Sequence, residues 1–132
     1  MTQDDEPRFE VVAPIFLVSD VPRARAYYSE ALAFKVGFEW ADADDEPVRY
    51  LIVQAGKVEV HLTKAEAVTP RFAYIFVDGV GDYYDTVTRR GAEIPEKLND
   101  KPWNMREFAA RDPDGNVLIF GEHLSRLSTP GS

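Results

Sequence analysis

The sequence predicts an α+β fold of two consecutive βαβββ modules that together form a curved mixed sheet around a cleft. The main observation is that a strand-like run, a helix-like run and three more strand-like runs occur twice along the 132 residues. An aspartate stands where each helix should begin, at Asp20 and Asp78, and a Tyr-Tyr pair follows each, at 27–28 and 83–84. Because a module of this size has too small a core to be stable alone, the two are expected to pack side by side.

The first module begins with a strand and a helix. Phe9 to Val18 is rich in β-branched and aromatic residues, which predicts a strand. Asp20 is a candidate N-cap, and Pro22 suits the first helical turn, where its missing N–H costs nothing. Apolar residues then recur at helical spacing to about Ala33. Three strands are expected next, over residues 35–41, 48–54 and 57–63, and Ala55-Gly56 predicts a hairpin between the last two.

The second module repeats this order. Residues 72–77 predict a strand, Asp78 an N-cap, and the residues after it a helix that ends at Gly91. The turn Asp112-Pro113-Asp114-Gly115 precedes the last strand, and its glycine suits the positive φ that such a turn needs. The three remaining strands are expected over residues 93–96, 104–111 and 116–121.

Composition and charge limit the classes of protein and partner. Hydrophobic residues make up 45% of the chain and charged residues 29%, as in a globular domain. The absence of cysteine excludes disulfides, thiolate metal sites and a cysteine nucleophile. A net charge of −8 disfavours nucleic acid and favours a cationic partner. Since no apolar run approaches the roughly 20 residues of a membrane span and no signal peptide is visible, no membrane partner and a cytoplasmic location are expected.

The expected organisation is one domain over residues 9–122, with modules of about 9–64 and 70–122 and flexible tails at 1–8 and 125–132. Helices on one side of two adjoining sheets would leave a concave face on the other. A ligand, a metal ion or a second subunit must fill such a face, so we expect the function to reside there.

Several motifs resemble the vicinal oxygen chelate superfamily of glyoxalases, bleomycin-resistance proteins and extradiol dioxygenases. Residues 13–24 and the first Tyr-Tyr pair are similar to the opening of that superfamily, and residues 112–116 resemble its Asp-Pro-Asp-Gly-Asn turn. Pro102-Trp103 followed by Arg106-Glu107-Phe108 resembles the bleomycin-resistance branch closely. The resemblance covers roughly residues 9–122. It implies a glyoxalase/bleomycin-resistance-like fold and a homodimer whose clefts are shared between subunits.

Enzymes of this superfamily hold a divalent metal ion with His, Gln or Glu side chains from particular strands. The matching positions in this sequence are Ala13, Phe72 and Ile119, and none of these side chains can ligate a metal ion. The resemblance therefore implies binding without a metal site, without another cofactor and without catalytic residues.

Aromatic residues are the first candidates for ligand contacts. In bleomycin-resistance proteins a planar part of the drug stacks between aromatic side chains in an acidic cleft, and the matching positions are Phe38 and Trp103. Trp40 shares the strand face of Phe38. Ordinary core packing is the alternative for Phe38, and covering of a strand edge is the alternative for Trp103. Residues 39–46 hold five acids and no base, so these acids are expected to supply unpaired negative charge. The run indicates either an acidic rim that attracts a cation or a solvated loop.

Polar residues of the strand over 57–63 are further candidates. Its alternation places Glu59 and His61 opposite the apolar residues, on the face expected to line the cleft. Tyr50 on the paired strand is expected to add a hydroxyl there, and an exposed Glu–His pair is the alternative. We expect Arg106 or Glu107 to anchor a loop or a dimer contact by a charge-assisted hydrogen bond.

The function predicted from these patterns is non-catalytic binding or sequestration of a small, planar, cationic molecule such as a bleomycin-type antibiotic. The cleft would be shared by a homodimer. A second hypothesis is an enzyme of the same superfamily (a lyase, isomerase or dioxygenase) with an atypical or absent metal site. A third is a dimeric scaffold whose cleft has lost any ligand.

Overall fold

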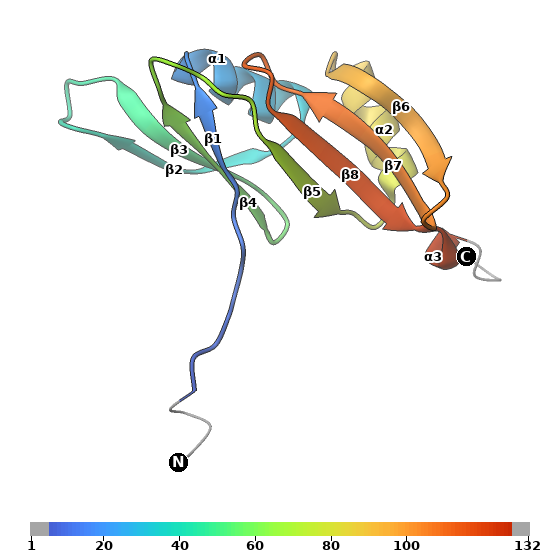
Figure 1. Ribbon diagram of the computed structural model, residues 1–132. Helices are drawn as coiled ribbons and strands as arrows, with labels where there is room; N and C mark the ends of the chain where they lie inside the picture. Colours follow the sequence, from blue (N-terminus) through green and yellow to red (C-terminus); the bar gives the residue numbers. More distant parts are fainter. Residues whose placement is uncertain (1–5, 128–132) are drawn as a thin grey trace.

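The computed structural model describes residues 6–127 as two four-stranded sheets that lie side by side (Figure 1). The first sheet contains β1 (Ile15–Val18), β2 (Lys35–Ala41), β3 (Val48–Ala55) and β4 (Val58–Lys64), in the order β1-β4-β3-β2. The second contains β5 (Phe72–Phe76), β6 (Glu93–Lys101), β7 (Met105–Arg111) and β8 (Val117–His123), in the order β5-β8-β7-β6. In each sheet the first pair is parallel and the others are antiparallel, so the two modules have the same topology. The α+β class and the repeated βαβββ order are therefore confirmed.

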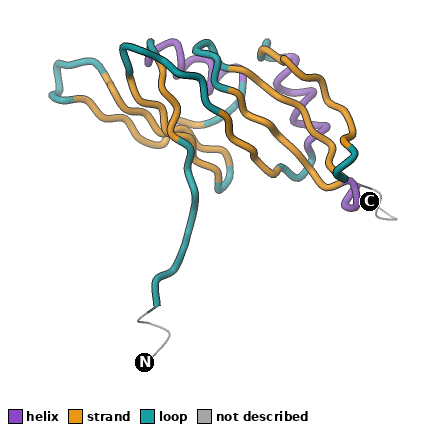
Figure 2. Tube along the Cα trace, in the orientation of Figure 1, coloured by secondary structure: helices purple, strands orange, loops and turns teal. Residues whose placement is uncertain are grey.

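The helices cover one face of the two sheets (Figure 2). Helix α1 (Val21–Ala26) continues into a π-helical turn, η2 (Tyr27–Ala31), and packs on β3 and β4. Helix α2 (Val80–Arg89) packs on β6, β7 and β8. One buried apolar cluster lies between helices and sheets; it includes Phe16, Tyr28, Leu51, Leu62, Val80, Phe108 and Phe120. The opposite face of both sheets carries no helix, so its side chains are open to a ligand or a partner.

The first strand is shorter than the sequence pattern predicts. Strand β1 starts at Ile15, and the His61 amide donates to the Pro14 carbonyl at 2.9 Å just before it. Residues 6–13 extend away from the sheets as an arm (Figure 1), with Phe9 98% exposed. A segment forms a β-strand only when a neighbouring strand pairs with it through backbone hydrogen bonds. The described residues of this chain provide no such strand beside the arm, so the arm is not part of β1.

Strand β6 is longer than predicted, because its pairing with β7 continues beyond residue 96. The expected strand over 93–96 continues to Lys101, opposite Met105 of β7. Pro95 lies at an irregularity in this pairing, where a missing N–H breaks no ladder bond. The short helix α3 (Leu124–Leu127) extends into the expected C-terminal tail over 125–132; residues 1–5 and 128–132 of the two tails lie outside the described residues.

One of the two predicted N-caps is wrong. Asp20 caps α1 as expected, because its carboxylate accepts from the Arg23 amide at 3.0 Å. Asp78 does not cap α2: Glu122 of β8 accepts from the first amides of that helix, at 3.1 and 3.0 Å. Asp78 instead forms an ion pair with Arg126. The carboxylate that accepts from these amides comes from a strand far along the chain, so no local sequence pattern could predict it.

The two modules are joined by tyrosine hydroxyls that cross between them. Tyr28 of the first module donates to Asp112 of the second at 2.8 Å, and Tyr83 of the second donates to the Leu32 carbonyl of the first at 2.8 Å. Both residues come from the repeated Tyr-Tyr pairs. Asp112 also accepts from Asn116, which donates in turn to the Leu17 carbonyl of β1. These bonds hold the two sheets in one fixed arrangement, so their open faces form one continuous surface.

Within residues 6–127 no helix is long and apolar enough to cross a membrane.

Candidate ligand-binding face

The open face of the first sheet carries all five of its predicted ligand residues. Ile52 of β3 is paired with both Phe38 and His61, and Tyr50 is paired with Trp40. Residues paired in this way point to the same side of a sheet, as do residues two apart on one strand. The buried residues of these strands alternate with them and point toward the helices. Phe38, Trp40, Tyr50, Glu59 and His61 therefore share one surface.

Three of these polar side chains form a hydrogen-bonded line. The Tyr50 hydroxyl lies 2.5 Å from Nδ1 of His61, and Nε2 of His61 lies 3.4 Å from Oε1 of Glu59. A tyrosine that donates to Nδ1 leaves Nε2 to carry the proton and to donate to the carboxylate. The His61 side chain is 21% exposed, so a ligand on this face can reach it. The arrangement can hold or move a proton at the imidazole.

The acidic run over residues 39–46 is partly neutralised by arginines. Glu39 forms an ion pair with Arg25, and Asp42 forms one with Arg49 at 3.3 Å. The expectation that both supply unpaired negative charge is therefore wrong, since Arg25 of α1 and Arg49 of the adjacent strand β3 lie against them. The remaining acids of the run lie exposed between β2 and β3; they are Asp44, Asp45 and Glu46.

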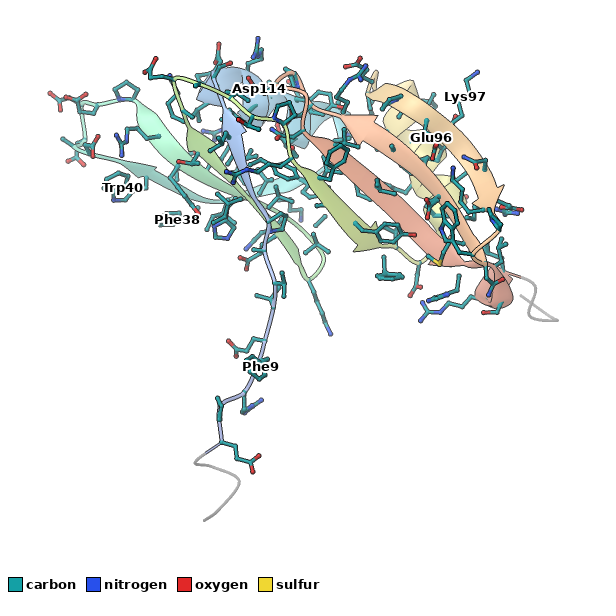
Figure 3. The ribbon with its side chains drawn as sticks, viewed as in Figure 1. Phe9, Phe38, Trp40, Glu96, Lys97 and Asp114 are labelled. Carbon is teal, nitrogen blue, oxygen red and sulfur yellow. The ribbon has the colours of Figure 1, made fainter. Side chains whose placement is uncertain are left out.

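An open groove of about 440 Å³ runs beside Trp40 and this acidic turn. Trp40 and Phe38 lie along β2 at the outer edge of the first sheet (Figure 3), and both are almost half exposed. The Arg49 guanidinium lies 5.7 Å from the Trp40 ring centroid. The indole face of Trp40 thus already contacts one planar cation, which belongs to the chain itself.

The open face of the second sheet is built around Glu107. The Tyr74 hydroxyl donates to Oε2 of Glu107 at 2.6 Å, and the Trp103 indole N–H donates to the same oxygen at 3.3 Å. Trp103 follows β6, in the turn before β7, and is 60% exposed. Burial and the adjacent carboxylate raise the pKa of Tyr74 well above its ordinary value. The hydroxyl therefore stays protonated and remains a donor to Glu107.

Gly121 makes this hydrogen bond possible. Tyr74 lies on β5 and Glu107 on β7, with β8 between them. The tyrosine ring crosses β8 at Gly121, where a Cβ atom would lie 2.1 Å from the tyrosine oxygen. Any other residue would push the ring away. Tyr74 and Gly121 were not among the predicted ligand residues, although a glycine inside a strand is a known sign of close approach by another group.

Comparison with known proteins identifies the family. The family model for the Glyoxalase/Bleomycin resistance protein/Dioxygenase superfamily matches residues 10–120. The chain belongs to this superfamily. Bleomycin resistance proteins of Geobacillus stearothermophilus and Staphylococcus aureus are 24% identical to it, over 84% of this chain and 95% of each relative. The resemblance stated from the motifs is thus confirmed at the level of the superfamily.

Solved structures of glyoxalase-like proteins share its fold. TioX from Micromonospora sp. ML1 has a TM-score of 0.73 at 22% identity, and the match covers 85% of this chain and 97% of TioX. A glyoxalase-related enzyme from Clostridium phytofermentans has a TM-score of 0.74 at 20% identity, with 90% and 98% covered. A lactoylglutathione lyase from Agrobacterium tumefaciens has a TM-score of 0.69 at 16% identity, with 89% and 96% covered. At these identities the likeness shows the fold alone.

The residues of this superfamily member do not fit the metal site of the superfamily's enzymes. Ala13 precedes β1, Phe72 begins β5 and Ile119 lies on β8, and none carries a donor atom in its side chain. The described part of the chain contains no group of three or more His, Cys, Asp or Glu side chains that could hold a metal ion.

The fold of this glyoxalase-superfamily chain separates the two predicted stacking residues. Phe38 lies on β2, at the outer edge of the first sheet, and Trp103 follows β6, at the outer edge of the second. Figure 1 shows these edges at opposite ends of the molecule. Six strands lie between β2 and β6, so at ~4.8 Å per strand spacing the two edges are roughly 30–35 Å apart along the sheets. A single chain does not bring both rings against one ligand.

Proposed function

We propose that this glyoxalase-superfamily protein binds a small, planar, cationic molecule without changing it, in a cleft that two copies of the chain share. The observation that supports this proposal is the position of Phe38 and Trp103. Both rings are exposed on the open face, but they lie at opposite edges of one chain. When the first sheet of one copy faces the second sheet of another, each ring can stack on one side of a flat ligand.

Exposed apolar surface supports the second copy. Phe72 is 71% exposed and Phe76 is 63% exposed on β5, and Phe9 and Val12 of the arm are exposed almost completely. Contiguous apolar patches larger than a few hundred Å² are uncommon on monomeric proteins. A homodimer would bury these side chains and would complete two equivalent clefts.

The chemistry of the open face supports a flat cation as the ligand. Aromatic rings, the acidic groove beside Trp40 and the carboxylate of Glu107 all favour positive charge on a planar group. The curated relatives are bleomycin resistance proteins, which makes bleomycin the first ligand to test. A micromolar dissociation constant needs about −8 kcal/mol, which two stacked rings, a few charge contacts and burial can supply.

Mixed dimers test the shared cleft directly. Phe38→Ala and Trp103→Ala are each expected to weaken bleomycin binding by about 1–3 kcal/mol, as for loss of a stacking anchor. After the two variants are mixed and their subunits exchanged, about one quarter of all clefts should regain wild-type affinity, because a twofold heterodimer holds one intact cleft. Calorimetric titration measures this fraction.

A matched control is Phe38→Ala mixed with the double variant Phe38→Ala/Trp103→Ala, in which no cleft can be intact. Recovery in the control, or its absence in the test mixture, would contradict the shared cleft. Saturable binding of an anionic or neutral metabolite, with no planar cation bound at sub-millimolar concentration, would contradict the ligand class.

A second candidate function is favoured by the line of Tyr50, His61 and Glu59. These groups can exchange a proton with a bound molecule, as a lyase or isomerase of this superfamily without the usual metal ligands would require. Mass spectrometry of bleomycin recovered after prolonged incubation distinguishes the two functions. An unchanged molecule supports binding alone, whereas a new product that His61→Gln abolishes supports catalysis.

A further inference from the structure

Glu107 is a buried carboxylate that forms no ion pair within the described residues. The residue is 5% exposed, although it lies on the face of the second sheet that no helix covers. Its cationic neighbours in sequence have other carboxylate partners, since Arg106 pairs with Asp100 and Lys101 pairs with Glu96. The Lys101 ammonium also lies 5.7 Å from the Trp103 ring centroid, so a ligand that stacks on that face of the indole must displace it. Among residues 6–127 no Lys, Arg or His forms an ion pair with Glu107. Burying a charge without a counter-charge costs free energy, so we expect a functional role for a buried carboxylate of this kind.

The hydrogen bonds of Glu107 orient it rather than neutralise it. Tyr74 and Trp103 are neutral donors, and both bonds end on Oε2. A cationic group that approaches the other oxygen, Oε1, displaces neither of them. The bond to the indole also fixes the carboxylate at the edge of the Trp103 ring. A flat molecule stacked on that ring therefore has Glu107 within reach of its own edge.

We propose that Glu107 receives the positive charge of the ligand, and that it selects planar cations with N–H donors, such as amidinium or guanidinium groups. This inference rests on the proposed function and names the residue that sets its ligand class. A charge-assisted hydrogen bond inside a partly dry cleft is stronger than a contact with an exposed acid. The acidic run is the weaker anchor, since Glu39 and Asp42 already have arginine partners and the other acids of the run are exposed.

Benzamidine and benzamide form a suitable pair of probes, because they have similar flat shapes and differ in charge. The Trp40→Phe background leaves Trp103 as the sole tryptophan, so indole fluorescence reports on the proposed site. Glu107→Gln keeps an oxygen that accepts from Tyr74 and Trp103 and removes the charge. Asp45→Asn is the matched control, because it neutralises an exposed acid of the turn between β2 and β3.

Benzamidine should quench Trp103 saturably in the Trp40→Phe background, and Glu107→Gln should weaken its binding about tenfold or more. Asp45→Asn should change the affinity less than about twofold, and benzamide should bind both proteins equally weakly. Should Glu107→Gln fail to fold, the carboxyl carbon of Glu107, followed by NMR in the protein with its Glu107 intact, should shift along the same saturation curve. The proposal would be overturned if benzamidine does not bind or if Glu107→Gln binds it as tightly as the protein with Glu107 intact. It would also be overturned if Asp45→Asn weakens binding as much as Glu107→Gln does.

These outcomes are separable from those for the proposed function. If bleomycin binds and the mixed dimers recover clefts while Glu107→Gln retains benzamidine, only the role of Glu107 is wrong. If bleomycin does not bind while benzamidine binding depends on Glu107, the cation acceptor stands and the sequestration of such antibiotics is wrong.

Discussion

The Tyr74 hydroxyl lies 2.6 Å from Oε2 of Glu107, on the far side of strand β8. The bond links the edge strand β5 to β7 above the backbone of the strand between them. It places a carboxylate, a tyrosine ring and, through Trp103, an indole on one surface. That surface lies away from the helices and from the buried cluster. These hydrogen bonds to Glu107 make the open face of the second sheet a candidate site.

Tyr74→Phe is expected to lower the free energy of unfolding by about 1–3 kcal/mol, because the buried Glu107 carboxylate loses a donor. Urea unfolding followed by circular dichroism measures the change. Tyr84→Phe is the control, since the ring of Tyr84 packs on Phe108 and its hydroxyl has no hydrogen bond within residues 6–127. Equal effects of the two substitutions would contradict a specific role for the bond from Tyr74 to Glu107.

Gly121→Ala is expected to destabilise the fold by about 1–3 kcal/mol, because the new Cβ would collide with the Tyr74 hydroxyl. It should also weaken benzamidine binding by displacing Glu107. Gly81→Ala provides the opposite control: a Cβ there meets nothing within 4 Å and lies inside α2, so stability should rise by about 0.5–1 kcal/mol. Thermal and urea unfolding of both variants test this contrast, and a Gly121→Ala protein as stable as wild type would contradict it.

The carboxyl group of Asp112 should titrate above its ordinary value of 3.8. Burial raises its pKa, while hydrogen bonds from Asn116 and Tyr28 oppose the rise. Because the folded pKa is the higher one, the contribution of Asp112 to stability is greatest at low pH and is lost as the pH rises through that value.

Carboxyl-carbon NMR measures this titration directly, and Asp100 is its control. Arg106 donates to Asp100 and lowers its pKa, so its contribution is present at neutral pH and is lost as the pH falls through the lowered value. The two groups should therefore titrate on opposite sides of 3.8. Titration of Asp112 below 3.8 would show that burial does not dominate at this carboxyl group.

The protein should be a homodimer, with a mass by light scattering of about twice the chain mass of 14.9 kDa. Phe9→Ser combined with Val12→Ser should weaken the dimer, because these exposed apolar side chains of the arm need a partner surface. Glu10→Ser, an exposed polar neighbour, should leave it unchanged. A wild-type monomer at tens of micromolar protein would contradict the shared cleft.

Purified protein should hold no stoichiometric transition metal, and chelator treatment should leave ligand affinity unchanged. The reason is the donor set, since Ala13, Phe72 and Ile119 occupy the positions where the superfamily's enzymes carry metal ligands. Elemental analysis of protein purified without chelator measures this. One zinc, manganese, iron or nickel ion per chain, bound on the open face, would overturn the non-catalytic function.

Local patterns were sufficient for most of the secondary structure. The hairpin of β3 and β4, the helix after Asp20 and the glycine turn at Gly115 all depend on residues within a few positions of one another. The cap of α2 was not predictable in this way. Glu122 reaches its first amides from a strand that ends more than forty residues later, so the nearby Asp78 was the wrong candidate.

The candidate site could be predicted as residue types and sheet faces, but its spatial arrangement could not. Strand alternation placed Glu59 and His61 on the open face, and motif resemblance selected Phe38 and Trp103. Their separation at opposite sheet edges depends on strand order, which no alternation pattern encodes. The partner of Glu39 was missed for a similar reason, because Arg25 comes from helix α1. The partner of Asp42 is Arg49, across the β2–β3 hairpin.

The amino-acid sequence by itself determined the two βαβββ modules, the open aromatic face and the absence of the superfamily's metal ligands. Periodicity, turns and side-chain chemistry are properties of short segments, so they can be recognised without knowledge of how the rest of the chain folds. The tertiary structure decided which charges remain without a partner. Glu107 becomes an oriented anion only because β5, β8 and β7 lie in that order and Gly121 lets Tyr74 cross between them. Such contacts join residues far apart in sequence, so only the packing of the whole chain brings them together.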